Sequence, residues 1–423
     1  MLRPSLILAF LLLLPSITEA GGDTPVFVPT ASVFEQFSPG VVKVEVIEKG
    51  SAAKATIGSG FFVSDDGYLI TNYHVVSKVV HDPERYYPEL VDASGESHPV
   101  DILAVDVIHD LAVLKSSLVP SAFLSLLGSP IKQGDRLYAL GHPHDLGLSI
   151  VEGTYNRDLE HTLYPKIHFT GSLNPGMSGG PTISHTGNVV GVNVSTAGNQ
   201  VSFLVPVNRV VDILAQATAP GYQPPAALLP TVASQMRAFQ NVYVTDILSA
   251  EAKTVPLGRY TVPTEPAPFF RCWGDVNRSP ERLHESVSHR CSTDDYVFIA
   301  GKQYSGIVTL NYQLITSDAL SPLRFYALYA SIFEWDTTPG GWEEHVTSWR
   351  CETQNVRNDS LPLRSVLCLR RYRKLDGLYD AVLKTAALGD QAAGLMSTLT
   401  MSGLEFENIR KLVVHHLEGV AWN

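Results

Sequence analysis

Between Val41 and Pro206 the chain is a succession of short strand-like segments separated by turn signals, and no long helical pattern interrupts them. Short apolar and β-branched segments at this spacing, punctuated by Gly or Asp-Gly, indicate an antiparallel all-β sandwich or a pair of barrels. An alternating strand–helix fold would need helical patterns between the strands. The segments are VVKVEVI, SGFFV, YLITN, LAVLK, RLYAL, LSIVEGTY, KIHF, NVVGVNV and VSFLVPV.

The rest of the chain has a different pattern. A helical pattern covers 206–217, and the Pro-rich stretch 221–234 is typical of a linker. We therefore expect one domain over 21–220 and a second, α+β domain of unrecognised fold over 235–423. In the second domain GIVTLNYQLIT and RFYALYASIFEW are predicted strands, whereas LYDAVLKTAAL and FENIRKLVVHHLEGV are predicted helices.

The first twenty residues predict export. One basic residue precedes an apolar run from Leu6 to Leu14, and small residues follow up to Ala20. The run is shorter than the roughly 20 residues that span a bilayer, which favours a secretory signal cleaved after Ala20 over an uncleaved anchor. We therefore expect a periplasmic or secreted protein with no membrane span in the mature chain.

The four cysteines, Cys272, Cys291, Cys351 and Cys368, all lie in the second half. In an exported chain an even number of cysteines predicts disulfides. Three pairings are possible, and the local one, 272 with 291 and 351 with 368, closes the shortest loops. A zinc site is disfavoured because no C-x2-C pair is present, so no metal is expected.

The net charge of −11 bears on partners. An acidic chain without a Lys/Arg stripe repels phosphate backbones, so nucleic acid is not an expected partner. The oligomeric state is left open by the sequence.

The segment NPGMSGGP, residues 174–181, holds Ser178 in a turn rich in Gly and Pro. A serine becomes a nucleophile when it has a base, a group that orients the base, and amide donors for the oxyanion. His74 follows a strand-like run, Asp110 precedes one, and the backbone N–H groups of Gly176 and Ser178 can converge on one oxygen. This chemistry needs no cofactor.

These segments resemble one known family. Residues 35–216 resemble the chymotrypsin-fold, trypsin-like serine proteases of the HtrA/Deg type: GSGFFVSDDGYLITNYHVV is similar to the family's His segment, HDLAVLK to its Asp segment and NPGMSGGP to its nucleophile segment. The resemblance implies two six-stranded antiparallel β-barrels with the site between them. It implies His74 as general base, Asp110 as its orienting group, Ser178 as nucleophile, and the amides of Gly176 and Ser178 as oxyanion hole.

The resemblance also implies a substrate pocket and an activity. Ser172 would lie at the pocket base, and the strand GVNVS, with Asn193 and Ser195, would form one wall. Because neither element supplies a carboxylate, we expect an endopeptidase that cleaves polypeptides after small or medium apolar residues. Met177 stands where the family has a polar residue, and no segment after Pro230 resembles a PDZ domain.

Three other interpretations are open at this point. GMSGG also fits the G-x-S-x-G elbow of α/β-hydrolases, which would give an esterase, but Asn174 and Pro175 break the strand that such an elbow needs. A protease-shaped binding or scaffold protein with a latent site is a second alternative. A metal bound by His142, His144 and His161 is a third, although H-x-H in a Pro/Gly loop is more often solvated.

Overall fold

The computed structural model describes residues 28–126, 130–251, 253–278, 281, 283–293, 295–334, 344–358 and 361–422. The predicted signal segment and its cleavage after Ala20 lie outside these ranges. Within them, no helix has the length and apolar character needed to cross a membrane.

The first half of the chain forms two closed antiparallel barrels of six strands each, so the predicted mainly β fold is confirmed. Helix α1 (Thr30–Phe37) and a short 3-10 turn precede them, α2 (Tyr73–His81) lies within the first, and α3 (Val207–Ala217) follows the second. The first barrel has the order β1-β2-β3-β6-β5-β4, and the second has the order β10-β11-β12-β9-β8-β7. The strands are β1 (Val41–Glu48), β2 (Ala53–Phe62), β3 (Tyr68–Thr71), β4 (Tyr86–Val91), β5 (Ser97–Asp106), β6 (Leu111–Ser116), β7 (Arg136–Gly141), β8 (Ser149–Asp158), β9 (Ile167–Phe169), β10 (Pro181–Ile183), β11 (Val189–Thr196) and β12 (Ser202–Pro206).

The two barrels share an apolar core. Phe61 and Ile70 of the first barrel belong to the same buried cluster as Tyr138, Leu140 and Val192 of the second. Successive strand residues point to opposite faces, so one apolar set fills each barrel and another reaches the neighbouring barrel. Side chains at this junction are therefore held by both barrels.

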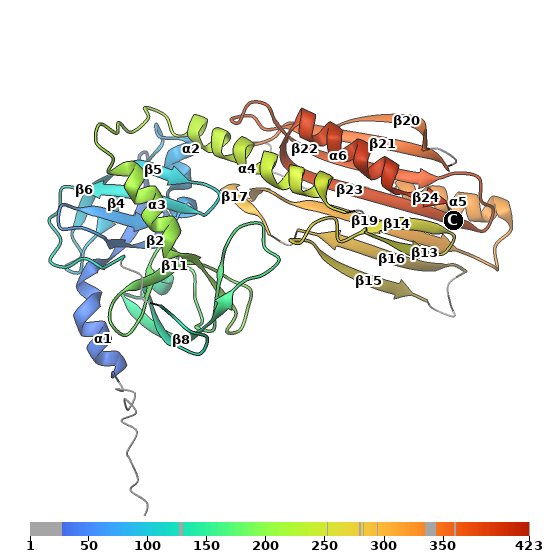
Figure 1. The fold of residues 1–423 in the computed structure, drawn as a ribbon. Helices are drawn as coiled ribbons and strands as arrows, with labels where there is room; N and C mark the ends of the chain where they lie inside the picture. The colour runs from blue at the N-terminus through green and yellow to red at the C-terminus, as the bar shows by residue number, and fades with distance from the viewer. Residues whose placement is uncertain are drawn as a thin grey trace, which may run out of the picture.

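The predicted linker contains the start of a long helix. Helix α4 (Leu229–Ser249) begins within the stretch predicted as linker, so only residues 221–228 run without helix. Val232 and Met236 pack with the first barrel, whereas Tyr243 and Ile247 pack with the second half of the chain. Figure 1 shows this helix crossing from the barrels to the C-terminal sheet.

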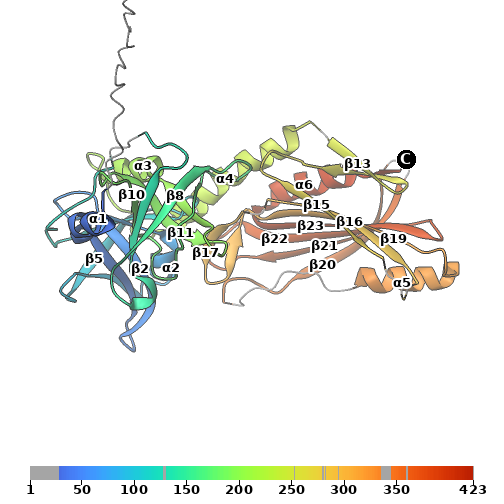
Figure 2. The ribbon, with the colours of Figure 1, turned by 90° about the horizontal axis from the view of Figure 1, so that it is seen from below.

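The second half is built on a seven-stranded antiparallel sheet in the order β15-β16-β19-β23-β22-β21-β20. Helices α4 and α6 (Phe406–Gly419) cover one face, and α5 (Pro322–Glu334) packs on the other, as Figure 2 shows. The remaining strands form a three-stranded sheet and the hairpin β17–β18. The strands are β13 (Lys253–Leu257), β14 (Tyr260–Thr264), β15 (Arg271–Asn277), β16 (Glu285–Ser292), β17 (Val297–Ala300), β18 (Gln303–Ser305), β19 (Val308–Thr316), β20 (Arg350–Asn358), β21 (Leu361–Arg371), β22 (Leu378–Ala387), β23 (Ala393–Glu405) and β24 (Ala421–Trp422).

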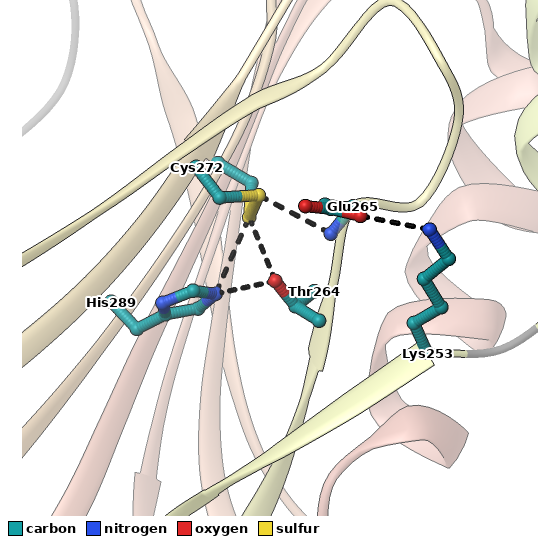
Figure 3. Close-up of a disulfide and its surroundings, with 6 residues drawn as sticks. Lys253, Thr264, Glu265, Cys272 and His289 are labelled. Atoms are coloured by element: carbon teal, nitrogen blue, oxygen red, sulfur yellow. Dashed lines mark hydrogen bonds and ion pairs between the residues drawn. A yellow bond between two sulfur atoms is a disulfide. The ribbon is translucent and has the colours of Figure 1, made fainter.

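Two disulfides tie the two edge strands of this sheet to their neighbours. Cys272 pairs with Cys291 across β15 and β16, and Cys351 pairs with Cys368 across β20 and β21. This is the local pairing among the three that the sequence allowed. Figure 3 shows His289 beside the first of these disulfides. Each closed loop of this size contributes roughly 3 kcal/mol by restricting the unfolded chain.

Two predictions in the second half were wrong. RFYALYASIFEW was predicted as a strand, but α5 covers most of it, and its buried Phe325 and Tyr329 lie four residues apart on one helical face. LYDAVLKTAAL was predicted as a helix, but it forms β22, an interior strand buried on both faces. A strand buried on both faces has no polar/apolar alternation, so its periodicity does not distinguish it from a helix. The predicted strand at β19 and the predicted helix at α6 are confirmed.

Candidate active site

His74 lies at the start of α2, where the chain leaves β3 of the first barrel. Asn72, the residue before this helix, is fully buried, and its side-chain amide donates to the carbonyl oxygen of Asp110 over 2.7 Å. The backbone N–H of Tyr73 donates to the same oxygen over 3.2 Å. The start of the helix is thereby fixed to the β5–β6 turn.

Asp110 lies in that turn, with a φ of 56°. Asp tolerates this left-handed conformation better than most residues, because its short polar side chain bonds locally. One carboxylate oxygen accepts the His74 backbone N–H at 2.8 Å, and the other lies 2.6 Å from His74 Nδ1. The carboxylate therefore makes Nδ1 the protonated nitrogen of a neutral ring and leaves Nε2 as a proton acceptor.

The electrostatics of His74 follow from this pairing. Burial by itself lowers the pKa of the imidazole, but the charge of Asp110 and its hydrogen bond together outweigh burial, so the pKa of His74 is raised above its ordinary value of 6.5. The side chain remains 26% exposed. Asp110 thus stabilises the imidazolium that forms when His74 takes a proton.

The segment before Ser178 is a tight turn. The Met177 N–H donates to Asn174 O over 3.0 Å, and Gly176 has a φ of 97°. Pro at the second position and a positive-φ Gly at the third are typical of a type II turn. The Pro175 carbonyl accepts the N–H of His144 at 2.8 Å. Because a trans peptide directs its N–H opposite to its C=O, the Gly176 N–H points the other way.

Within the described residues, neither the Gly176 nor the Ser178 N–H donates a hydrogen bond to the protein. Both amides lie in a loop that is otherwise bonded on each side. The N–H of Ser59, on β2, donates to Ser178 O over 2.8 Å, and the Gly179 N–H donates to Asn193 O over 2.9 Å. The N–H groups of Gly176 and Ser178 are therefore available to an oxygen that enters the site.

The Ser178 hydroxyl donates to the carbonyl of Val194 over 3.1 Å. No hydrogen bond joins it to the His74 ring among the residues that the structure describes. Both side chains nevertheless line one pocket. A rotation about χ1 between staggered positions redirects such a hydroxyl at little cost, since Val194 loses only one hydrogen bond.

The pocket beside Ser178 has a volume of about 310 Å³. None of the ten residues that line it is Asp, Glu, Lys or Arg. The lining residues are Ile57, His74, Leu173, Asn174, Pro175, Gly176, Ser178, Val194, Ser195 and Thr196.

Two of the three predicted pocket residues lie elsewhere. Ser195 lines the pocket, but Ser172 is exposed and is not among the lining residues. Asn193 is fully buried. Its amide nitrogen donates to Leu140 O and Met177 O, and its amide oxygen accepts from Thr182. Asn193 therefore holds the nucleophile loop and does not contact the pocket.

Ser59 and the loop after β7 support the turn, a role that the sequence did not predict for either. The Ser59 hydroxyl donates to Gly176 O at 2.7 Å and accepts the N–H of His142 at 2.9 Å. Ser59 lies inside the GSG of the His segment, which is the only sequence signal for it. Met177, where a polar residue was expected, is fully buried in the second barrel.

Asp145 anchors the same loop through ion pairs to the first barrel. Its carboxylate lies 2.7 Å from Lys43 Nζ and 2.9 Å from Lys54 Nζ, and both lysines also pair with the buried Glu45. Hydrogen bonds from Lys43 and Lys54 lower the pKa of Asp145 to about 2. Both His144 and Asp145 have positive φ, at 50° and 60°. The ion pairs therefore hold a backbone conformation that L-residues rarely adopt.

The geometry does not support the α/β-hydrolase elbow or the metal site at the three histidines. The residues before Ser178 form a turn and the residues after Gly180 form strand β10, so the strand–serine–helix order of an α/β-hydrolase elbow is contradicted. The His161 ring bonds to Pro268 O, and the His142 ring lies 3.4 Å from Ser59 Oγ, so these two rings face different partners.

Comparison with known proteins finds matches to proteases. Residues 58–192 match the trypsin-like peptidase domain. A probable periplasmic serine endoprotease DegP-like of Chlamydia pneumoniae is 34% identical over 181 residues, which cover 40% of this chain and 36% of that protein. Serine protease HTRA1A of Danio rerio is 30% identical over 201 residues, covering 44% of this chain and 41% of that protein. The predicted resemblance to HtrA/Deg-type proteases is confirmed.

Two solved structures of proteases align with part of the chain. A serine endoprotease from Yersinia pestis aligns with a TM-score of 0.39 and 24% identity, over 47% of this chain and 69% of that one. A protease from M. tuberculosis in its active form aligns with a TM-score of 0.40 and 22% identity, over 46% of this chain and 86% of that one. The chain spans well under half the length of each of the two curated relatives named above.

Proposed function

We propose that this chain, in which residues 58–192 match the trypsin-like peptidase domain, is a serine endopeptidase that hydrolyses polypeptides through an acyl-enzyme. The observation that carries the proposal is the His74–Asp110 pair at 2.6 Å, on the wall of the pocket that Ser178 also lines. A base oriented in this way is what a serine hydroxyl requires to become a nucleophile at neutral pH.

The geometry supports the following steps. The Ser178 hydroxyl turns from Val194 O to His74 Nε2, which takes its proton as Oγ bonds to the substrate carbonyl carbon. The carbonyl oxygen becomes an anion and is stabilised by the free N–H groups of Gly176 and Ser178. His74 then gives its proton to the amine nitrogen, the C–N bond breaks, and the acyl group stays on Ser178. Water, deprotonated by His74, releases the acid product and restores the hydroxyl.

The pocket supports a preference for small or medium apolar side chains before the cleaved bond. Leu173 and Val194 give it apolar walls, and none of the described residues that line it has a carboxylate to pair with Lys or Arg. Its volume of about 310 Å³ is at the small end of the range for ligand pockets. A substrate with Val or Ala at this position should therefore be cleaved faster than one with Lys.

Export is part of the proposal. Two disulfides are expected in an oxidising compartment, and one relative is named as a periplasmic endoprotease. We place the protein in the periplasm or outside the cell. Its predicted partner is the polypeptide substrate.

A second candidate, a binding protein with a latent site, has one observation in its favour. The Ser178 hydroxyl is bonded to Val194 O and not to His74. This arrangement is also a resting state of an active enzyme, since a single χ1 rotation removes it.

A fluorophosphonate probe tests both functions. The enzyme is expected to be labelled at Ser178, and both Ser178→Ala and His74→Ala should abolish labelling and peptide cleavage. Ser172→Ala, at an exposed position outside the pocket, is the matched serine control and should be labelled like the parent. Absence of labelling in the folded parent protein, with retained peptide binding, would establish the binding protein instead.

A further inference from the structure

The hairpin β17–β18 belongs to the second half of the chain but packs against the helix that carries His74. The Tyr73 hydroxyl, at the start of α2, donates to Ile299 O over 3.0 Å. A second contact to α2 comes from outside the hairpin: Lys374, between β21 and β22, donates from Nζ to the carbonyl of His81 at the end of α2 over 2.9 Å. Figure 1 shows β17 placed between the barrels and the large sheet. The hairpin is therefore part of the surroundings of the candidate active site.

One face of this hairpin is aromatic and partly open to solvent. Val297 and Ile299 are buried on one side of β17, so Phe298 lies on the other, and it pairs with Tyr304 of β18. The rings of Phe298 and Tyr304 are 6.0 Å apart, and those of Tyr304 and Tyr296 are 4.5 Å apart. Tyr296 is 47% exposed. We call Tyr296, Phe298 and Tyr304 the aromatic face.

The aromatic face begins at the wall of the pocket beside Ser178. The Phe298 ring lies edge-to-face with the His74 ring, with 5.9 Å between centroids. His74 itself lines the pocket. In an extended peptide one residue spans about 3.3 Å, so a chain that is attacked at Ser178 reaches this face within two residues.

Contacts from the β8–β9 loop of the second barrel hold the aromatic face in position. Lys166 Nζ lies 2.7 Å from Asp295, and both side chains are about 15% exposed or less. The N–H of Leu163 donates to the other oxygen of Asp295, and the Tyr164 hydroxyl donates to Tyr296 O over 2.9 Å. Both barrels thus bind the hairpin, which gives the aromatic face a fixed distance from the pocket.

We propose that the aromatic face is a substrate subsite, supplied by the C-terminal domain, for an apolar side chain. This inference rests on the proposed function. Its occupant is the residue immediately before the one that fills the pocket, because neighbouring side chains of an extended peptide point to opposite faces. With one side chain in the pocket, the preceding one points away from it, on the side of His74 and Phe298. The C-terminal domain thereby takes part in substrate selection.

The test compares peptides that share Val at the pocket position and carry Leu or Ala before it. Their dissociation constants are measured by fluorescence anisotropy on full-length Ser178→Ala protein, which binds without cleaving. Phe298→Ala and Tyr296→Ala are each added to this background. Phe406→Ala is the matched control, because Phe406 is also an aromatic of the C-terminal domain, is 52% exposed and contacts Tyr379 in the large sheet.

We expect the Leu peptide to bind about tenfold more weakly to the Phe298 variant than to the parent, while the Ala peptide changes little. Tyr296→Ala should reduce the same preference, and Phe406→Ala should leave it intact. Equal loss for both peptides would show that Phe298 only supports His74, and an unchanged preference in both variants would exclude the subsite. Should Phe298→Ala not fold, Tyr296→Ala alone decides, because its side chain is half exposed.

Failure of the proposed function is seen separately. Fluorophosphonate labelling of the protein with Ser178 intact tests catalysis, whereas the anisotropy measurement does not depend on it. Loss of labelling with a retained Leu preference overturns the enzyme but not the subsite. Labelling without any Leu preference overturns the subsite alone.

Discussion

The oxyanion turn depends on one glycine, and Gly176→Ala tests this dependence. Gly176 has a φ of 97°, and a Cβ at this position would lie in hard contact with the carbonyl oxygen of His142. That carbonyl is backbone, so it cannot move aside like a flexible side chain. The alanine variant must therefore leave the type II turn, and the Gly176 N–H then no longer points into the site.

Two costs are expected, and they can be separated. An L-residue in a left-handed conformation costs about 1–2 kcal/mol of folding free energy. Loss of one oxyanion donor reduces kcat about 10²–10³-fold, with little change in KM, because the interaction is made mainly in the transition state. Gly134→Ala is the matched control: Gly134 has the same φ of 97°, but no atom of the described residues lies within 4 Å of its added Cβ.

The assay is steady-state cleavage of a fluorogenic peptide with Val before the bond, together with thermal unfolding of both variants. Both alanine variants should unfold at lower temperature than the parent, and only Gly176→Ala should lose kcat. A Gly176→Ala enzyme with parental kcat would refute the assignment of this amide to the oxyanion hole. Equal loss of kcat in both variants would show that destabilisation, not the turn, limits the rate.

Three further predictions concern the base and the loop that supports the turn. Because Asp110 raises the pKa of His74, kcat/KM should rise with pH through a midpoint above 6.5, and a midpoint at or below 6.5 would contradict the shift. The same ion pair stabilises the fold below pH 6.5, and this stabilisation is lost as the pH rises through the raised pKa. In steady-state peptide cleavage, Asp110→Asn should lower kcat by about 10³–10⁴-fold and leave KM at the parental value, because the amide no longer fixes the ring tautomer of His74. Asp145→Asn should lower kcat roughly two- to fivefold, which corresponds to the energy of exposed ion pairs, and Asp145→Glu should restore part of the lost kcat. A parental kcat for Asp145→Asn at low salt would show that Lys43 and Lys54 do not act on the turn.

The segments that carry the chemistry could be predicted from the sequence because their signals are local. Strand patterns separated by Gly and Asp-Gly turns predicted an all-β sandwich or a pair of barrels, and the resemblance carried by the His74, Asp110 and Ser178 motifs implied two barrels and named the three candidate side chains. The Gly and Pro residues of 174–181 predicted a turn around Ser178, because φ preferences are set within a few residues. Each motif could be recognised from neighbouring residues.

Other features depend on contacts between distant segments. α5 and β22 were mispredicted because the faces that each segment buries depend on how it packs in or on the large sheet, which its own residue pattern does not show. Asn193 was expected in the pocket, but it bonds to carbonyls on two other segments.

The sequence by itself therefore determined the barrel half and the three side chains of the candidate site. Only the tertiary structure decided what surrounds them: the ion pairs of Asp145, the Ser59 hydroxyl beneath the turn, and the placement of Phe298 against His74. The physical reason is range. Backbone conformation is encoded by adjacent residues, whereas packing partners separated by about a hundred residues or more meet only because the folded chain buries apolar surface between them.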